Sequence, residues 1–105
     1  MTETLKDVLV GLLDSVWHRV ARPNPGDRYI VWAEDGEGSA IAGDNVKLEQ
    51  SIQGQIHYFT RKESDPNVEE IQKALGMAKI SFYLDAVQYE DETKYIHYSW
   101  VFEVS

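Results

Sequence analysis

Apolar residues between Leu5 and Val20 recur at steps of three and four positions, the spacing of one continuous helical stripe. The stripe consists of Leu5, Val8, Leu9, Leu12, Leu13, Val16, Trp17 and Val20. Thr4 is placed to cap this helix, and the segment ARPNPGD, with two prolines and a glycine, prevents its continuation. We therefore predict a helix over 5–20, with Trp17 in the core and His18 on the solvent side.

After that turn the periodicity changes from 3.6 to 2. The segment YIVWA (29–33) is short, β-rich and apolar on both faces, which is typical of an interior strand. Over 48–61 the even positions are mostly apolar and the odd positions mostly polar, which predicts a long half-buried strand. Gly54, in the middle of that strand, indicates a bulge or a close approach of another backbone.

A second helix is predicted within RKESDPNVEEIQKALGMAK. Asp65 suits the N-cap, Pro66 the first helical position and Gly76 the stop. The apolar stripe of this helix is narrow, so we expect it to lie on a sheet face rather than inside the core.

Two alternating segments follow, at 79–90 and 94–104, and EDET is short enough to join them as a hairpin. The expected order is helix, strand, strand, helix, strand, strand. Strands in pairs with short connections favour an antiparallel layer. We therefore predict one α+β domain over 1–105, in which both helices pack on an antiparallel sheet of about four strands.

Composition limits the function classes. The chain has 18 acidic and 10 basic side chains, a net charge of −8, and Arg61–Lys62 is the only adjacent basic pair, so we expect no specific binding to nucleic acid. The absence of cysteine excludes disulfides, thiol nucleophiles and thiolate metal sites. No segment resembles a membrane span or a signal peptide, so we expect synthesis in the cytosol without membrane attachment.

Candidate catalytic groups are few. The three histidines fall in three different settings, and none lies near a recognisable nucleophile motif. His57 and His97 are both on mostly polar strand faces and would approach each other if those strands paired. A metal site there lacks a nearby third ligand, so we expect exposed histidines. The sequence predicts no enzyme, no cofactor and no metal.

The segment after YIVWA combines three glycines with Glu34, Asp35, Glu37 and Asp44. Its charge would repel phosphate, and it lacks the ligand spacing of a calcium loop. We interpret it as a mobile acidic connection that acts against a partner. The candidate assembly residues are Glu34, Asp35, Glu37, Asp44, Asn45, Arg61 and Lys62.

The order and spacing of several short motifs carry a family resemblance. These are LKDVLVGLLDSV, DRYIVWAEDGEG, AGDNVKLEQSIQGQIHYFTRKESDPNVEEIQKAL and ISFYLDAVQYEDETKYIHYSWVFEV. Together they cover about Leu5 to Val104, and the chain resembles the small tail completion and tail terminator proteins of long-tailed bacteriophages and prophages. No single motif is diagnostic.

The resemblance implies a structural role in the virion. Such a subunit forms a ring, usually six-fold, which caps the finished tail tube and provides the joint to the head. The implied partners are further copies of the chain, the major tail tube protein and a head-completion or connector protein, with assembly in the host cytoplasm. DNA would pass through the ring, and no cofactor or catalytic residue is implied. Two alternatives remain, another small head–tail connector or adaptor and an acidic inhibitor that mimics DNA.

Overall fold

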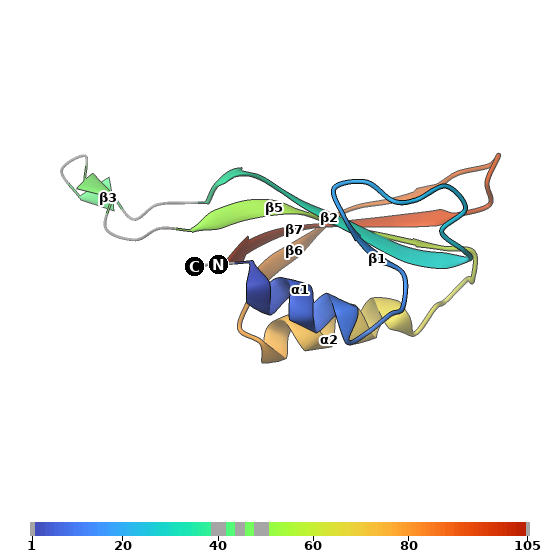
Figure 1. Cartoon of the computed structure of the whole chain (residues 1–105), viewed down its shortest axis with the longest axis horizontal. Coiled ribbons are helices and arrows are strands. Elements are labelled where there is room, and N and C mark those ends of the chain that lie inside the picture. The colour runs from blue at the N-terminus through green and yellow to red at the C-terminus, as the bar shows by residue number, and fades with distance from the viewer. Residues whose placement is uncertain (1, 39–41, 44–45, 48–50, 105) are drawn as a thin grey trace.

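Two helices lie on one face of a five-stranded sheet in the computed structural model, which describes residues 2–38, 42–43, 46–47 and 51–104 (Figure 1). The elements are α1 (Glu3–Val10), β1 (Val16–His18), β2 (Arg28–Glu37), β3 (Ala42–Gly43), β4 (Val46–Lys47), β5 (Ile52–Thr60), α2 (Asn67–Met77), β6 (Ser81–Tyr89) and β7 (Ile96–Val104).

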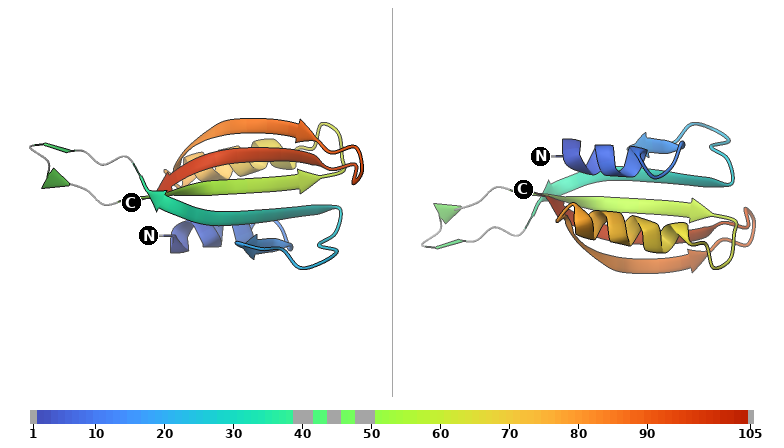
Figure 2. Two further views of the ribbon diagram at one scale, coloured as in Figure 1. Left: turned by 90° about the horizontal axis from the view of Figure 1, so that it is seen from above. Right: turned by 90° about the horizontal axis from the view of Figure 1, so that it is seen from below.

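The strand order of the main sheet is β1-β2-β5-β7-β6 (Figure 2). All neighbouring pairs are antiparallel except β1 and β2, which are parallel. The short strands β3 and β4 pair with each other beyond the ends of β2 and β5. The predicted α+β class is confirmed, with one more strand in the main sheet than the four expected.

The first helix is shorter than predicted. It ends at Val10 and is followed by Gly11, and Val16–His18 form β1 instead of continuing the helix to Val20. Thr4 lies inside α1, and Thr2 occupies the N-cap position. The helix does not continue to Val20 because residues 16–18 pair with β2 instead. The first hydrogen bond of this β1–β2 pair runs from the Ile30 amide to the Ser15 carbonyl at 2.9 Å. Leu12, Leu13 and Val16 still pack against the core, so they fit a helical stripe without being helical.

β2 is longer than predicted, because β5 pairs with it along its whole length. Residues 34–37, which were expected in a loop, belong to the strand, and the pairing shifts register between Glu34 and Gly36. Gly54 lies opposite Glu34, and a Cβ on Gly54 would lie 2.1 Å from the Ala33 carbonyl oxygen. The predicted close approach at Gly54 is confirmed, and the irregularity lies on the strand opposite it.

The hydrophobic core lies between the helices and the sheet. It contains Leu5, Leu9, Ile30, Trp32, Ile56, Tyr58, Ile71, Leu75, Ile80, Trp100, Phe102 and Val104. α2 lies on the sheet face as predicted, although it continues through Gly76 to Met77. The opposite face of the sheet is not covered by either helix (Figures 1 and 2). In the part of the chain that the structure describes, neither helix has the length and apolar character needed to cross a bilayer.

The last two strands form the predicted hairpin. β6 and β7 pair antiparallel from Ser81↔Glu103 to Tyr89↔Ile96, and EDET lies in their connection. The even positions of β7 face the helices, and Trp100 and Phe102 are buried there. β6 pairs only with β7 within the described residues, so it forms one edge of the sheet.

Candidate assembly surfaces

The predicted assembly residues do not converge on one site. Glu34, Asp35 and Glu37 lie toward the end of β2, whereas Arg61 and Lys62 follow β5 at the other end of the same strand pair. The register pairs Arg28 with Thr60 at one end and Glu37 with Ile52 at the other. Nine residue steps separate the ends, a distance of roughly 30 Å in a strand. Asp44 and Asn45 lie outside the described residues.

Glu34 is held in place by the neighbouring strand β1. Nε2 of His18 donates to Glu34 Oε1 at 2.5 Å, and the His18 ring stacks on Trp32 with ring centroids 4.0 Å apart. The hydrogen bond from His18 is the main reason that the pKa of Glu34 is lowered. Glu34 therefore ties β1 to β2, whereas Asp35 is exposed at the register shift.

Arg61 joins three connections at the other end of the sheet. Its Nη1 donates to Asp27 Oδ1 at 2.8 Å and its Nε to the Thr93 carbonyl at 3.0 Å. Its guanidinium also lies 4.3 Å from the centroid of the Tyr95 ring. Arg61 thus links the segment before β2 and the end of β5 to the β6–β7 hairpin, which gives this exposed side chain a structural role.

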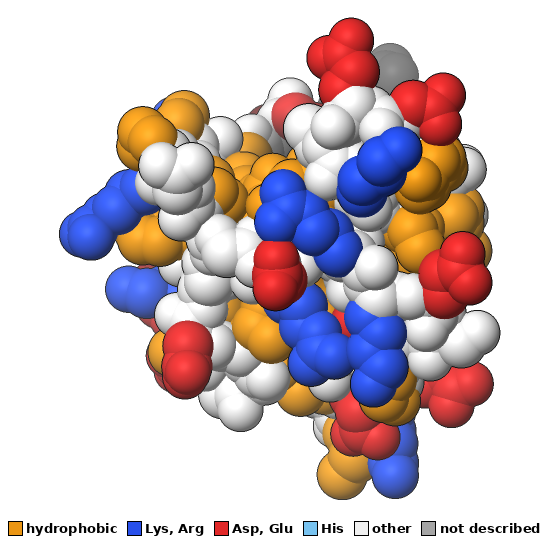
Figure 3. All heavy atoms as spheres, turned by 90° about the vertical axis from the view of Figure 1, so that its right-hand side faces the viewer, with side chains coloured by type: hydrophobic (Ala, Val, Ile, Leu, Met, Phe, Trp, Pro, Cys, Tyr) orange, Lys and Arg blue, Asp and Glu red, His pale blue; other side chains and the backbone are white. Residues whose placement is uncertain are grey.

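Lys62 lies beside Arg61 on a shallow open hollow of about 330 Å³, which is also lined by Asp27 and Arg28. Figure 3 views this end of the molecule and shows basic side chains gathered near its middle, with carboxylates around them. The mixture of signs favours polar contacts with a protein surface over binding of a polyanion.

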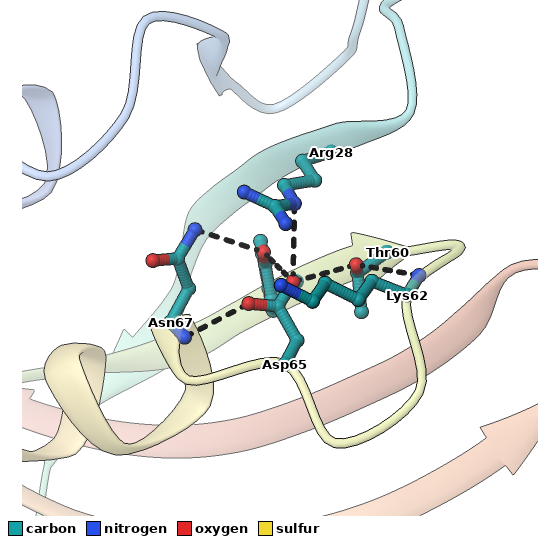
Figure 4. Close-up of polar contacts among 6 residues, drawn as sticks. Arg28, Thr60, Lys62, Asp65 and Asn67 are labelled. Atoms are coloured by element: carbon teal, nitrogen blue, oxygen red, sulfur yellow. Dashed lines mark hydrogen bonds and ion pairs between the residues drawn. The ribbon is translucent and has the colours of Figure 1, made fainter.

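Asp65 lies at the centre of a buried polar cluster. The sequence predicted this residue only as the N-cap of the second helix. Its Oδ2 accepts hydrogen bonds from the Tyr58 hydroxyl at 2.6 Å and the Thr60 hydroxyl at 2.7 Å (Figure 4). Arg28 Nε lies 3.3 Å from the same oxygen, and the backbone amide of Asn67 donates to Oδ1 at 2.9 Å. The cluster fixes the start of α2 to β2 and β5.

The pKa values of this cluster fit a structural role. Burial pushes the pKa of Asp65 upward, but hydrogen bonds from Tyr58, Thr60 and the Asn67 amide, with the charge of Arg28, outweigh it and hold the pKa below its usual value. Burial and the bond to Asp65 raise the pKa of Tyr58 to about 12, so its hydroxyl stays a donor. An ionised acceptor with four donors around it is a stable anchor for a helix.

His57 and His97 meet on the face of the sheet that the helices leave open. His57 Nδ1 and His97 Nε2 share a hydrogen bond of 2.7 Å, and His97 stacks on Phe59 at 4.2 Å between ring centroids. Their predicted approach is confirmed, but both are half-buried rather than exposed. The described residues contain no group of three or more His, Cys, Asp or Glu side chains that could hold a metal ion.

We expect this histidine pair to make the protein less stable below neutral pH. Burial lowers the pKa of both rings from the usual 6.5, and the pKa of His97 is lowered further by His57. As the pH falls through 6.5, the unfolded chain binds protons before the folded one, so the free energy of unfolding decreases. Urea titrations between about pH 8 and pH 5 should show a smaller decrease for His57→Gln/His97→Gln. An equal decrease in both proteins would contradict the assignment.

Exposed apolar side chains gather on the edge strand β6. Among the described residues seven large apolar side chains are exposed, and four of them, Tyr83, Leu84, Val87 and Tyr89, lie on this strand. Tyr83 lies opposite Val101 on the face of the sheet that neither helix covers (Figure 2), and no strand among the described residues pairs with the outer edge of β6. This surface was not predicted from the sequence, although apolar residues at both even and odd positions of 82–89 indicate it.

No protein-family model and no curated protein matches this chain. Its function is therefore inferred from these surfaces and from the resemblance that its sequence motifs carry.

Proposed function

We propose that this protein is a ring-forming structural subunit of a phage or prophage virion, which caps the tail tube and joins it to the head. The observation that carries the proposal is the edge strand β6, which leaves Tyr83, Leu84, Val87 and Tyr89 between 45% and 59% exposed. Unpaired strand edges with clustered apolar side chains are typical sites of protein association. In an assembled ring these side chains would be buried against a neighbouring subunit, whereas in a monomer they would stay in contact with water.

Two further features support an assembly role. β3 and β4 extend the β2–β5 pair away from the body, and the molecule measures 50 Å along its longest axis against 25 and 24 Å along the others (Figure 1). Such an extension can reach a neighbouring subunit or the tail tube. The net charge of −8 would reduce adhesion of DNA that passes through a ring.

The proposal predicts self-association that increases with concentration. Native mass spectrometry and electron microscopy of the purified protein should show closed rings, with six copies as the expected number. The rings should also bind tubes polymerised from the major tail protein of the same genome. A protein that stays monomeric up to millimolar concentration and does not bind such tubes would contradict the proposal. Rings that bind only head-side proteins would instead indicate a connector.

A further inference from the structure

We propose that the subunits of this ring join head to tail through the two edges of the main sheet, so that β6 of one copy lies against the β1 edge of the next. This inference rests on the proposed ring and identifies its interface. The occupant of each edge is a second copy of the same chain.

β6 has the side-chain pattern of an interior strand although it lies at an edge. Leu84 and Val87 lie opposite Trp100 and Tyr98 and therefore point toward the helix side, whereas Tyr83 lies opposite Val101 and points to the open face. Apolar residues on both faces are typical of a strand whose two faces are both covered, and a second copy of the chain against β6 would cover these side chains. Within the described residues, β6 has only β7 as a neighbour.

The segment that follows β1 carries exposed apolar and basic groups, and its first residues line a hollow on the open face of the sheet. Val20 is 77% exposed, and the side chain of Arg19 is 69% exposed. The Arg22 guanidinium lies 5.0 Å from the centroid of the half-buried Trp17 ring. Within the described residues β1 pairs only with β2, so its other side is also an open sheet edge.

The charged residues near the two sheet edges favour a contact between a β6 edge and a β1 edge over a contact between two β6 edges. The segment around β1 carries Arg19 and Arg22 against Asp14, and Glu34 of β2 lies 4.0 Å from Arg19. β6 and its hairpin carry an excess of carboxylates, Asp85, Glu90, Asp91 and Glu92, against Lys94 and the Arg61 that donates to the Thr93 carbonyl. Two β6 edges would bring like charges together, which is unfavourable. A β6 edge and a β1 edge avoid this repulsion, because Arg19 and Arg22 can face the carboxylates of β6 and its hairpin. Contacts between unlike surfaces of identical subunits form a ring where the rotation closes.

The absence of native cysteine permits a direct test by cross-linking. Val20 lines an open hollow with His97, and Gln88 lies opposite His97 in the register, so both positions are on the open face. With a short bismaleimide, Val20→Cys/Gln88→Cys should give a ladder of covalent oligomers up to the ring size. Each single variant should give no covalent oligomers on a denaturing gel, and neither should the control Lys73→Cys/Gln88→Cys, which places one cysteine on α2.

A charge exchange tests the same contact without cross-linking. Arg19→Glu/Arg22→Glu and Asp91→Lys/Glu92→Lys should each weaken self-association roughly tenfold or more at low salt. An equal mixture should restore it, because each variant then meets an unlike edge on both sides. Thermal unfolding of each variant checks that the subunit remains folded.

The outcomes separate this inference from the proposed function. Covalent dimers of Gln88→Cys alone, or a mixture of charge variants that does not assemble, would overturn the head-to-tail contact while the ring of the wild-type chain still stands. A wild-type chain that forms no ring would overturn the proposed function and this inference together.

Discussion

Replacing Asp65 with alanine should lower the free energy of unfolding by about 3 kcal/mol, a large part of the 5–15 kcal/mol typical of a domain. The substitution removes the acceptor of the Tyr58 and Thr60 hydroxyls and the charge beside Arg28. The two hydroxyls would then be buried without an acceptor, whereas in the unfolded chain they bond to water, and this difference destabilises the folded state. The Arg28 side chain is 39% exposed and can turn to solvent, which keeps the loss below that of a fully buried ion pair.

Urea denaturation followed by tryptophan fluorescence measures this loss. Glu63→Ala, an exposed carboxylate two positions earlier in the chain, is the matched control and should change stability by less than about 0.5 kcal/mol. The difference between wild type and Asp65→Ala should also shrink in acid. The folded-state pKa of Asp65 lies below its usual 3.8, so its contribution is present above 3.8 and is lost as the pH falls through the folded value. Equal stability at neutral pH would show that the cluster does not anchor α2.

Asp65 also shows how far the sequence can predict such a site. Its position before Pro66 indicated a helix start, and its side chain does accept the Asn67 amide. The N-cap position itself is Pro66, one residue after the predicted Asp65. Local sequence indicates the contact between Asp65 and Asn67 because it joins neighbouring residues. It does not contain the approach of Arg28, which depends on the pairing of β2 with β5.

The first helix shows the opposite limit. Val16 follows the helical spacing of the residues before it, yet it lies in β1 because pairing with β2 outweighs local propensity. A pattern of buried positions records which side chains reach the core. It does not record the backbone that carries them. The chain bends after Gly11 while Leu12, Leu13 and Val16 still reach the core, but the prediction fails further on, because Trp17 is only half-buried and Val20 is 77% exposed.

The predicted assembly residues come from two separate charged segments of the chain, at 34–45 and 61–62, whereas a common surface depends on strand order. Glu34 and Arg61 lie toward opposite ends of the β2–β5 pair, so they form no common patch. Strand order also places β6 at an edge of the sheet. Apolar side chains that would be buried in an interior strand are therefore exposed on β6. Alternation predicts which residues share a face, but the number of neighbours that a strand has follows from the whole sheet.

Trp100→Ala should lower the free energy of unfolding by about 3–5 kcal/mol, which would leave much of a marginal domain unfolded. Trp100 is fully buried, and its Nε1 donates to Gln72 Oε1 at 3.0 Å, so the substitution creates a cavity and removes a bond between β7 and α2. Tyr83→Ala removes an aromatic side chain that is 59% exposed on the neighbouring strand. It should leave the urea midpoint almost unchanged while it weakens self-association. A similar loss of stability in both variants would mean that β6 is covered within the subunit, and that its exposed side chains are not an assembly surface.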